Sequence, residues 1–172
     1  FWYSVNNYNV HSYRPADTPL YRQINVWIDT YYIALHEATA QDLVRFLNSG
    51  EVPADLLKSY TDGWSNLGEG ESDSDDGCTV QINKQGQFSV TDADQRLPAT
   101  FLSFEMAQAF ALWMGFNLPT ESQWQKAARG TDLRIWPWGN QYPDDTFANF
   151  GSTPDCLPDP VYSHPKGVSP YG

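Results

Sequence analysis

The residues best suited to chemistry are oxygen donors in a short segment near the end of the sequence. Ca²⁺ is a hard cation that takes six to eight oxygens from carboxylates, side-chain amides and backbone carbonyls. Such oxygens are offered by the Asn149 amide, the Asp155 carboxylate and the carbonyls of Phe150 and Leu157. Two alternatives stay open here. Asp159 is a competing carboxylate, and Asn149 could form an Asx-turn that leaves the acidic side chains in solvent.

The chain has two cysteines, Cys78 and Cys156, which lie far apart in the sequence. In a secreted protein they could form one disulfide that closes a long loop. In a cytosolic protein they would remain two free thiols. An acidic composition with few lysines and many Asn, Tyr and Trp residues favours the extracellular setting, so we expect a secreted or cell-surface protein.

Other catalytic and metal-binding patterns have little support in the sequence. The histidines His11, His36 and His164 are scattered and lack the H-x-x-x-H spacing of a zinc site. No G-x-S-x-G motif or phosphate-binding glycine loop is present. Residues 69–77 are rich in Asp, Glu, Gly and Ser, but their glycine is out of register with an EF-hand, which favours a solvated acidic loop.

Length and composition predict one globular domain over residues 1–172, with a hydrophobic content of 41% and seven tryptophans. Lys and Arg number 10 against 21 Asp and Glu, a net charge of −11. This acidity argues against nucleic-acid partners and anionic membrane surfaces. The sequence contains no run of about 18 apolar residues and therefore predicts no membrane span. Because the chain starts at Phe1 and shows no signal peptide, we expect a processed or partial chain.

The hydrophobic pattern and capping residues predict three helices. One follows Thr39, whose side chain forms a capping box with Asp42, and one runs from Ser103 to Met114. The third is the best defined: Thr120 begins it, with Gln123 as the capping-box partner, and Gly130 ends it. Its apolar stripe is predicted to be Trp124, Ala127 and Ala128.

The strand signals are shorter. Residues 21–33 alternate between apolar and polar side chains and predict a strand followed by a second one, and residues 78–91 predict a hairpin. Residues 1–20 resemble an extended arm with at most one short strand. Residues 51–77 are predicted to be an acidic insertion loop with one helical turn at Leu56 and Leu57. The predicted class is α+β, with two packed helices, a small twisted antiparallel sheet and many loops.

Three motifs occur in a fixed order: LPTESQWQKAARG at 118–130, WPWGN at 136–140 and FANF at 147–150. Together they resemble the formylglycine-generating enzyme family, also called sulfatase-modifying-factor domains, whose fold is a variant of the C-type lectin fold. Residues 32–39 are similar to the opening motif of that family, with Ala38 in place of the usual valine. The resemblance implies this fold for the chain.

The resemblance also implies where metals would bind. A structural calcium would be held by Asn149 and Phe150, and by Asp155 and Leu157 when a shortened loop is aligned on the following Pro-Val pair. The oxidases of the family bind Cu(I) through a cysteine pair near their C-terminal end, in a segment expected beyond residue 172. Neither cysteine of this chain matches that pair, so the resemblance assigns no catalytic residue.

Two functions follow from the resemblance. The first is a non-catalytic extracellular module for scaffolding, assembly or ligand binding, stabilised by calcium. The alternative is a fragment of a formylglycine-generating copper oxidase that acts on a sulfatase cysteine. Because the fold of the family closes with strands from the segment expected beyond residue 172, we also expect a protein partner or neighbouring copies of the chain to complete it.

Overall fold

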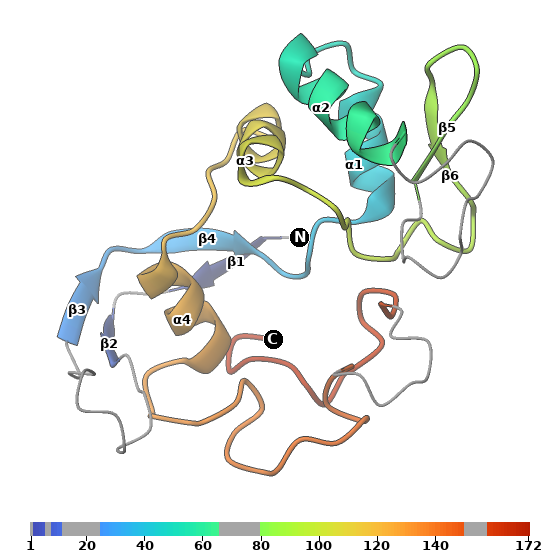
Figure 1. The fold of residues 1–172 in the computed structure, drawn as a ribbon. Helices are drawn as coiled ribbons and strands as arrows, with labels where there is room; N and C mark the ends of the chain where they lie inside the picture. The colour runs from blue at the N-terminus through green and yellow to red at the C-terminus, as the bar shows by residue number, and fades with distance from the viewer. Residues whose placement is uncertain (1, 6–7, 12–24, 66–79, 150–157) are drawn as a thin grey trace. The chain divides into compact units, whose positions relative to one another are not determined.

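The computed structural model describes residues 2–5, 8–11, 25–65, 80–149 and 158–172 (Figure 1). Helices and short antiparallel strands are both present, which confirms the α+β class. The chain forms two compact units. Unit 1 comprises Phe1–His36, Pro119–Phe150 and His164–Gly172, and unit 2 comprises Glu37–Leu118 and Gly151–Ser163.

Unit 1 contains two antiparallel strand pairs. β1 (Trp2–Val5) pairs with β4 (Tyr31–Ala34), and β2 (Tyr8–His11) pairs with β3 (Asn25–Ile28). In β3, Ile28 is buried and Trp27 is exposed, as the alternating pattern predicts. The prediction of at most one strand among residues 1–20 was wrong. Both strands in that region are defined by pairing with β3 and β4 and not by a pattern of their own.

Helix α4 (Glu121–Arg129) of unit 1 packs against β2 and β3. Thr120 is its N-cap and forms the predicted capping box with Gln123, and Gly130 ends it with φ of +67°. Of the predicted apolar stripe, Ala127 and Ala128 are half-buried, but the placement of Trp124 in it was wrong. The Trp124 side chain is 56% exposed, whereas Lys126 is fully buried. The strands against which α4 packs select the face that is buried, and the local pattern of apolar residues does not encode that choice.

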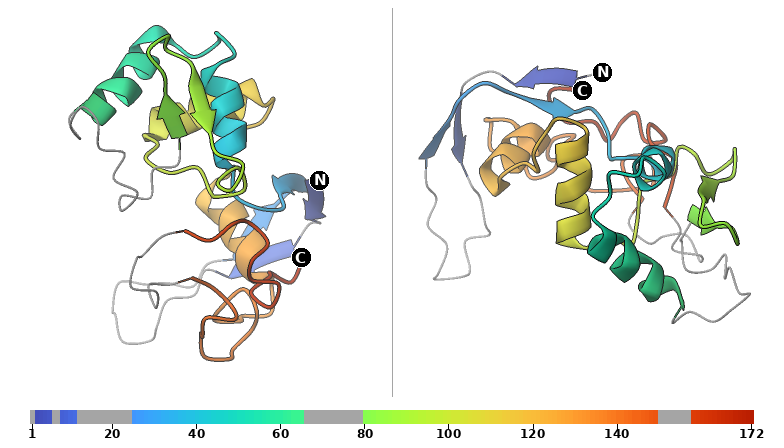
Figure 2. Two further views of the ribbon diagram at one scale, coloured as in Figure 1. Left: turned by 90° about the vertical axis from the view of Figure 1, so that its right-hand side faces the viewer. Right: turned by 90° about the horizontal axis from the view of Figure 1, so that it is seen from above.

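Unit 2 holds the main hydrophobic core. Helix α1 (Ala40–Leu47) begins at Thr39 with the predicted capping box to Asp42. The strand β6 (Phe88–Val90), which forms a hairpin with β5 (Val80–Ile82), packs beside α1 (Figure 2). Helix α3 (Phe104–Trp113) also contacts α1. The buried side chains of this core are Ala40, Leu43, Val44, Phe46, Leu47, Tyr60, Val80, Phe88 and Met106.

Helix α2 (Ala54–Ser65) occupies the first part of the stretch predicted to be a loop with a single helical turn. It is longer than predicted because Tyr60 is buried in the core of unit 2, while Leu56 and Leu57 pack against that core. Tertiary burial therefore stabilises a helix whose own sequence signal is weak. The acidic residues 69–77 lie outside the described residues.

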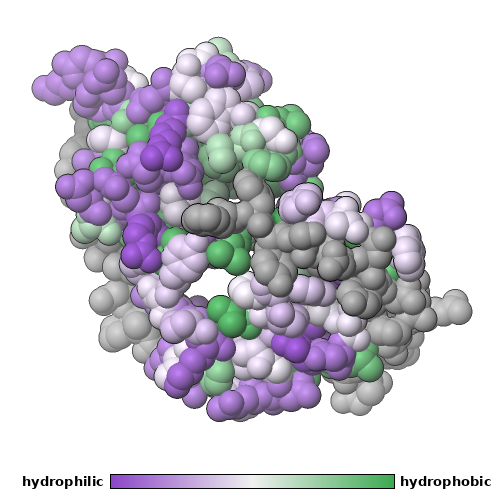
Figure 3. Space-filling view, turned by 180° about the vertical axis from the view of Figure 1, so that it is seen from behind, coloured by the Kyte–Doolittle hydropathy of each residue, from purple (hydrophilic) through white to green (hydrophobic). Residues whose placement is uncertain are grey.

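On the face shown in Figure 3, hydrophobic and hydrophilic residues both reach the surface of the described part of the chain. Scattered exposed apolar residues of this kind are ordinary on soluble domains. Among the described residues, no helix combines the length and the hydropathy that crossing a bilayer requires.

Candidate functional site

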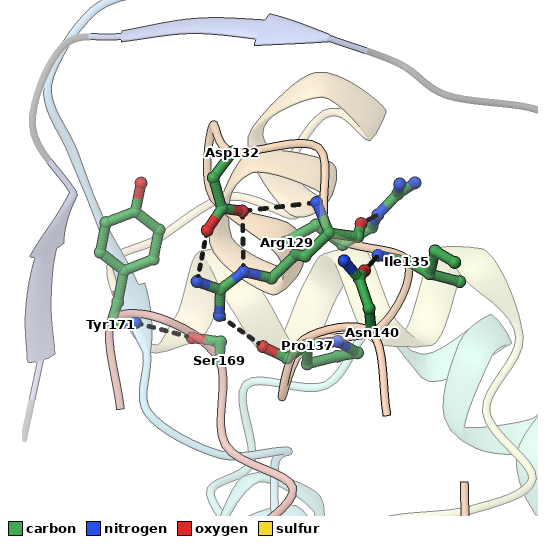
Figure 4. A network of polar contacts seen from close by, with 8 residues as sticks. Arg129, Asp132, Ile135, Pro137, Asn140, Ser169 and Tyr171 are labelled. Carbon is green, nitrogen blue, oxygen red and sulfur yellow. Dashed lines mark hydrogen bonds and ion pairs between the residues drawn. The ribbon is translucent and has the colours of Figure 1, made fainter. Parts of the chain in front are cut away.

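The loop that follows α4 is organised around Arg134, whose hydrogen bonds reach Asp132, Pro137 and Arg129, the partners labelled in Figure 4. Its guanidinium group donates two hydrogen bonds to Asp132, from Nε at 2.9 Å and from Nη2 at 2.7 Å. Nη1 donates to the carbonyl of Pro137 at 2.9 Å. The carbonyl of Arg134 accepts a hydrogen bond from Nε of Arg129 at 2.9 Å, which ties the loop to the last turn of α4. The guanidinium group and the carbonyl of Arg134 therefore both fix the conformation of the loop.

The Asp132–Arg134 pair has the bidentate geometry that makes arginine–carboxylate contacts strong. The guanidinium group lowers the pKa of Asp132 to about 2, mainly through the side-chain hydrogen bonds. The same contact raises the pKa of Arg134. Because the Asp132 side chain is 58% exposed, solvent screens the pair, and it stabilises the loop by only a fraction of its Coulomb energy.

The WPWGN motif forms a tight turn immediately after Arg134. The amide of Trp136 donates to the carbonyl of Gly139 at 2.9 Å, and the amide of Gly139 donates back to Trp136 at 3.0 Å. The side-chain oxygen of Asn140 accepts a hydrogen bond from the amide of Ile135 at 2.8 Å. The asparagine of this motif therefore closes the turn by bonding to the backbone.

Three aromatic rings stack between this turn and the following loop. Trp136 and Trp138 have ring centroids 5.7 Å apart and an interplanar angle of 5°, and Trp138 and Phe147 are 5.0 Å apart at 16°. The indole N–H of Trp138 donates to the carbonyl of Gln141 at 3.1 Å, and Phe147 is buried. Stacked aromatic rings therefore join these two loops.

The candidate calcium segment starts directly after this aromatic stack. Asn149 is partly buried and lies two residues beyond Phe147. The neighbouring Asp144 fixes the preceding turn by accepting hydrogen bonds from the amide and the hydroxyl of Thr146, and these bonds lower the pKa of Asp144. The alternative carboxylate, Asp159, is partly buried in unit 2.

The remaining predicted site residues lie outside the described residues: Phe150, Asp155, Leu157, Cys78 and Cys156. Calcium binding and the disulfide therefore stay predictions. Within the described ranges, no three His, Cys, Asp or Glu side chains gather in a way that could hold a metal ion.

Sequence reasoning missed a contact between the buried Lys126 and the half-buried Tyr31. The Lys126 ammonium group lies 5.6 Å from the centre of the Tyr31 ring, within the range of a cation–π contact. The Tyr31 hydroxyl donates to the carbonyl of Gln123 at 2.6 Å. Burial lowers the pKa of Lys126 and, together with Tyr171, raises the pKa of Tyr31 to about 12. Tyr31 and Lys126 are far apart in the sequence, so no local sequence pattern predicts their contact.

Comparison with known proteins gives a match over nearly the whole chain. Residues 10–172 match the model of the family described as sulfatase-modifying factor enzyme 1-like domain. The chain is 40% identical over 88 residues to a hercynine oxygenase of Mycobacterium tuberculosis, which covers 48% of this chain and 20% of that protein. It is 44% identical over 54 residues to a formylglycine-generating enzyme of Thermomonospora curvata, covering 31% and 18%.

A third similar protein is the inactive C-alpha-formylglycine-generating enzyme 2 of Mus musculus, 43% identical over 47 residues, which is 27% of this chain and 15% of that protein. The chain spans about a fifth or less of the length of the curated relatives it matches. The names of these relatives thus describe both enzymes and an inactive protein.

Proposed function

Because the chain belongs to the sulfatase-modifying factor enzyme 1-like domain family, we propose that it is a non-catalytic module of this family, used in an extracellular setting for scaffolding, assembly or ligand binding. The family membership confirms the resemblance expected from the three motifs. The family alone does not fix the activity, because one fold supports both active and inactive members.

The observation that carries the proposal is how the motifs at 118–130 and 136–140, and the loop between them, use their polar groups. Arg134 directs its guanidinium nitrogens to Asp132 and to the carbonyl of Pro137. Thr120 and Gln123 bond to each other across the start of α4, and Asn140 bonds to a backbone amide of its own loop. These contacts stabilise the end of a helix and the turns of a loop, as expected for residues with a structural role.

A structural calcium ion fits this proposal. Asn149 would supply an amide oxygen to it, with Phe150, Asp155 and Leu157 as the other predicted ligands from this chain. The ion would neutralise part of the negative charge of the chain, and it would fix the conformation of the segment that follows the aromatic stack. Asn149 is partly buried and follows a turn ordered by Asp144, which supports a preorganised position for the first ligand.

The test is the thermal unfolding of the 172-residue chain with EDTA and with increasing Ca²⁺. We expect the unfolding temperature to rise with Ca²⁺, since a ligand that binds only the folded state stabilises it by RT ln(1 + [L]/Kd). Asn149→Ala and Asp155→Ala should each weaken this response, while Asp159→Ala, the alternative carboxylate, should leave it unchanged. The proposed ligand set is contradicted if the unfolding temperature of the native chain does not change with Ca²⁺. It is also contradicted if only Asp159→Ala abolishes the change.

Assembly is tested separately by sedimentation velocity. If a protein partner or further copies complete the fold, the chain should associate with itself or be unstable alone. A well-folded monomer of 19.5 kDa would contradict this part of the proposal.

The second candidate is that the chain is part of a copper oxidase that converts a sulfatase cysteine to formylglycine. It is supported by the similarity to a formylglycine-generating enzyme. The longer protein that contains this domain would be incubated with Cu(I), O₂, a thiol reductant and a cysteine-containing sulfatase peptide, because the cysteine supplies only two of the four electrons that reduce O₂ to water. Mass spectrometry would detect exchange of the thiol sulfur for an aldehyde oxygen. Conversion of the peptide would refute the non-catalytic role, and an unchanged peptide would support it.

A further inference from the structure

We draw no further inference here: the strongest candidate, the exposed face of α3 in unit 2 with the apolar side chains of Phe104 and Leu112, carries none because nothing among the described residues shows what covers it.

Discussion

Gly167 lies against the carbonyl of Phe147 so closely that no larger residue fits. A Cβ atom added at Gly167 would lie 1.7 Å from the Phe147 oxygen and 2.8 Å from its carbonyl carbon. Non-bonded heavy atoms normally stay about 3.5 Å apart. Gly167→Ala must therefore displace one backbone segment by more than an ångström, because neither contact atom belongs to a side chain that could rotate away.

We expect Gly167→Ala to lower the free energy of unfolding by about 3 kcal/mol, at the upper end of the usual cost of overpacking. For a chain of this length that corresponds to a fall of roughly 6–12 °C in the unfolding temperature. Because Phe147 stacks on Trp138, the tryptophan fluorescence should also change. Asn149 lies two residues further on, so any stabilisation by Ca²⁺ should weaken as well.

Gly86→Ala is the control for this prediction. Gly86 has open space around it, but its φ of +77° is unfavourable for alanine, which costs about 1 kcal/mol. Thermal and urea unfolding of both variants would measure the difference. Surface substitutions usually change the free energy of unfolding by less than about 0.5 kcal/mol. If Gly167→Ala lowers the free energy of unfolding by less than this, or by no more than Gly86→Ala does, the packing of Gly167 on Phe147 is refuted.

Three further predictions concern stability. Phe46 is 1% exposed and contacts the rings of Phe110 and Trp113. Phe46→Ala should therefore lower the free energy of unfolding in urea by about 3–5 kcal/mol, and Phe46→Leu should lower it clearly less. Equal losses in the two variants would contradict the ring contacts. Thr120→Ala removes the capping box of α4 and should cost about 1 kcal/mol, whereas Thr120→Ser should be nearly neutral; an unchanged Thr120→Ala variant would show that the cap contributes nothing. Because the pKa of Tyr31 is raised from 10.0 to about 12, the unfolded chain ionises first, and stability should fall as the pH rises from 10 to 12. The loss is at most about 3 kcal/mol and is reduced by the partial exposure of the phenol; a Tyr31→Phe variant with the same pH dependence would refute it.

The parts of the fold that the sequence predicted depend on interactions between near neighbours. The capping boxes of Thr39 and Thr120 join residues three positions apart, and Gly130 ends α4 through its own backbone conformation. The alternation that buries Ile28 and exposes Trp27 follows from the two-residue repeat of a strand. Local geometry defines all of these features, so the sequence alone was enough to predict them.

The family also followed from sequence, because three motifs in a fixed order are specific even when each is weak. The calcium ligands, the disulfide and the extracellular location stay predictions. They depend on residues 150–157, on Cys78 and Cys156, or on the setting of the whole protein, all of which lie outside the described residues.

Tertiary structure decided which surfaces are buried. The sequence pattern placed Trp124 in the interior, but the strands that cover α4 bury Lys126 against Tyr31 and leave Trp124 in solvent. The stack of Trp136 on Trp138 and Phe147 likewise brings together two loops that no periodic pattern connects. Helix ends and strand repeats are local and are written in the sequence, whereas the choice of the buried face belongs to segments far apart in the chain and is made only when they pack.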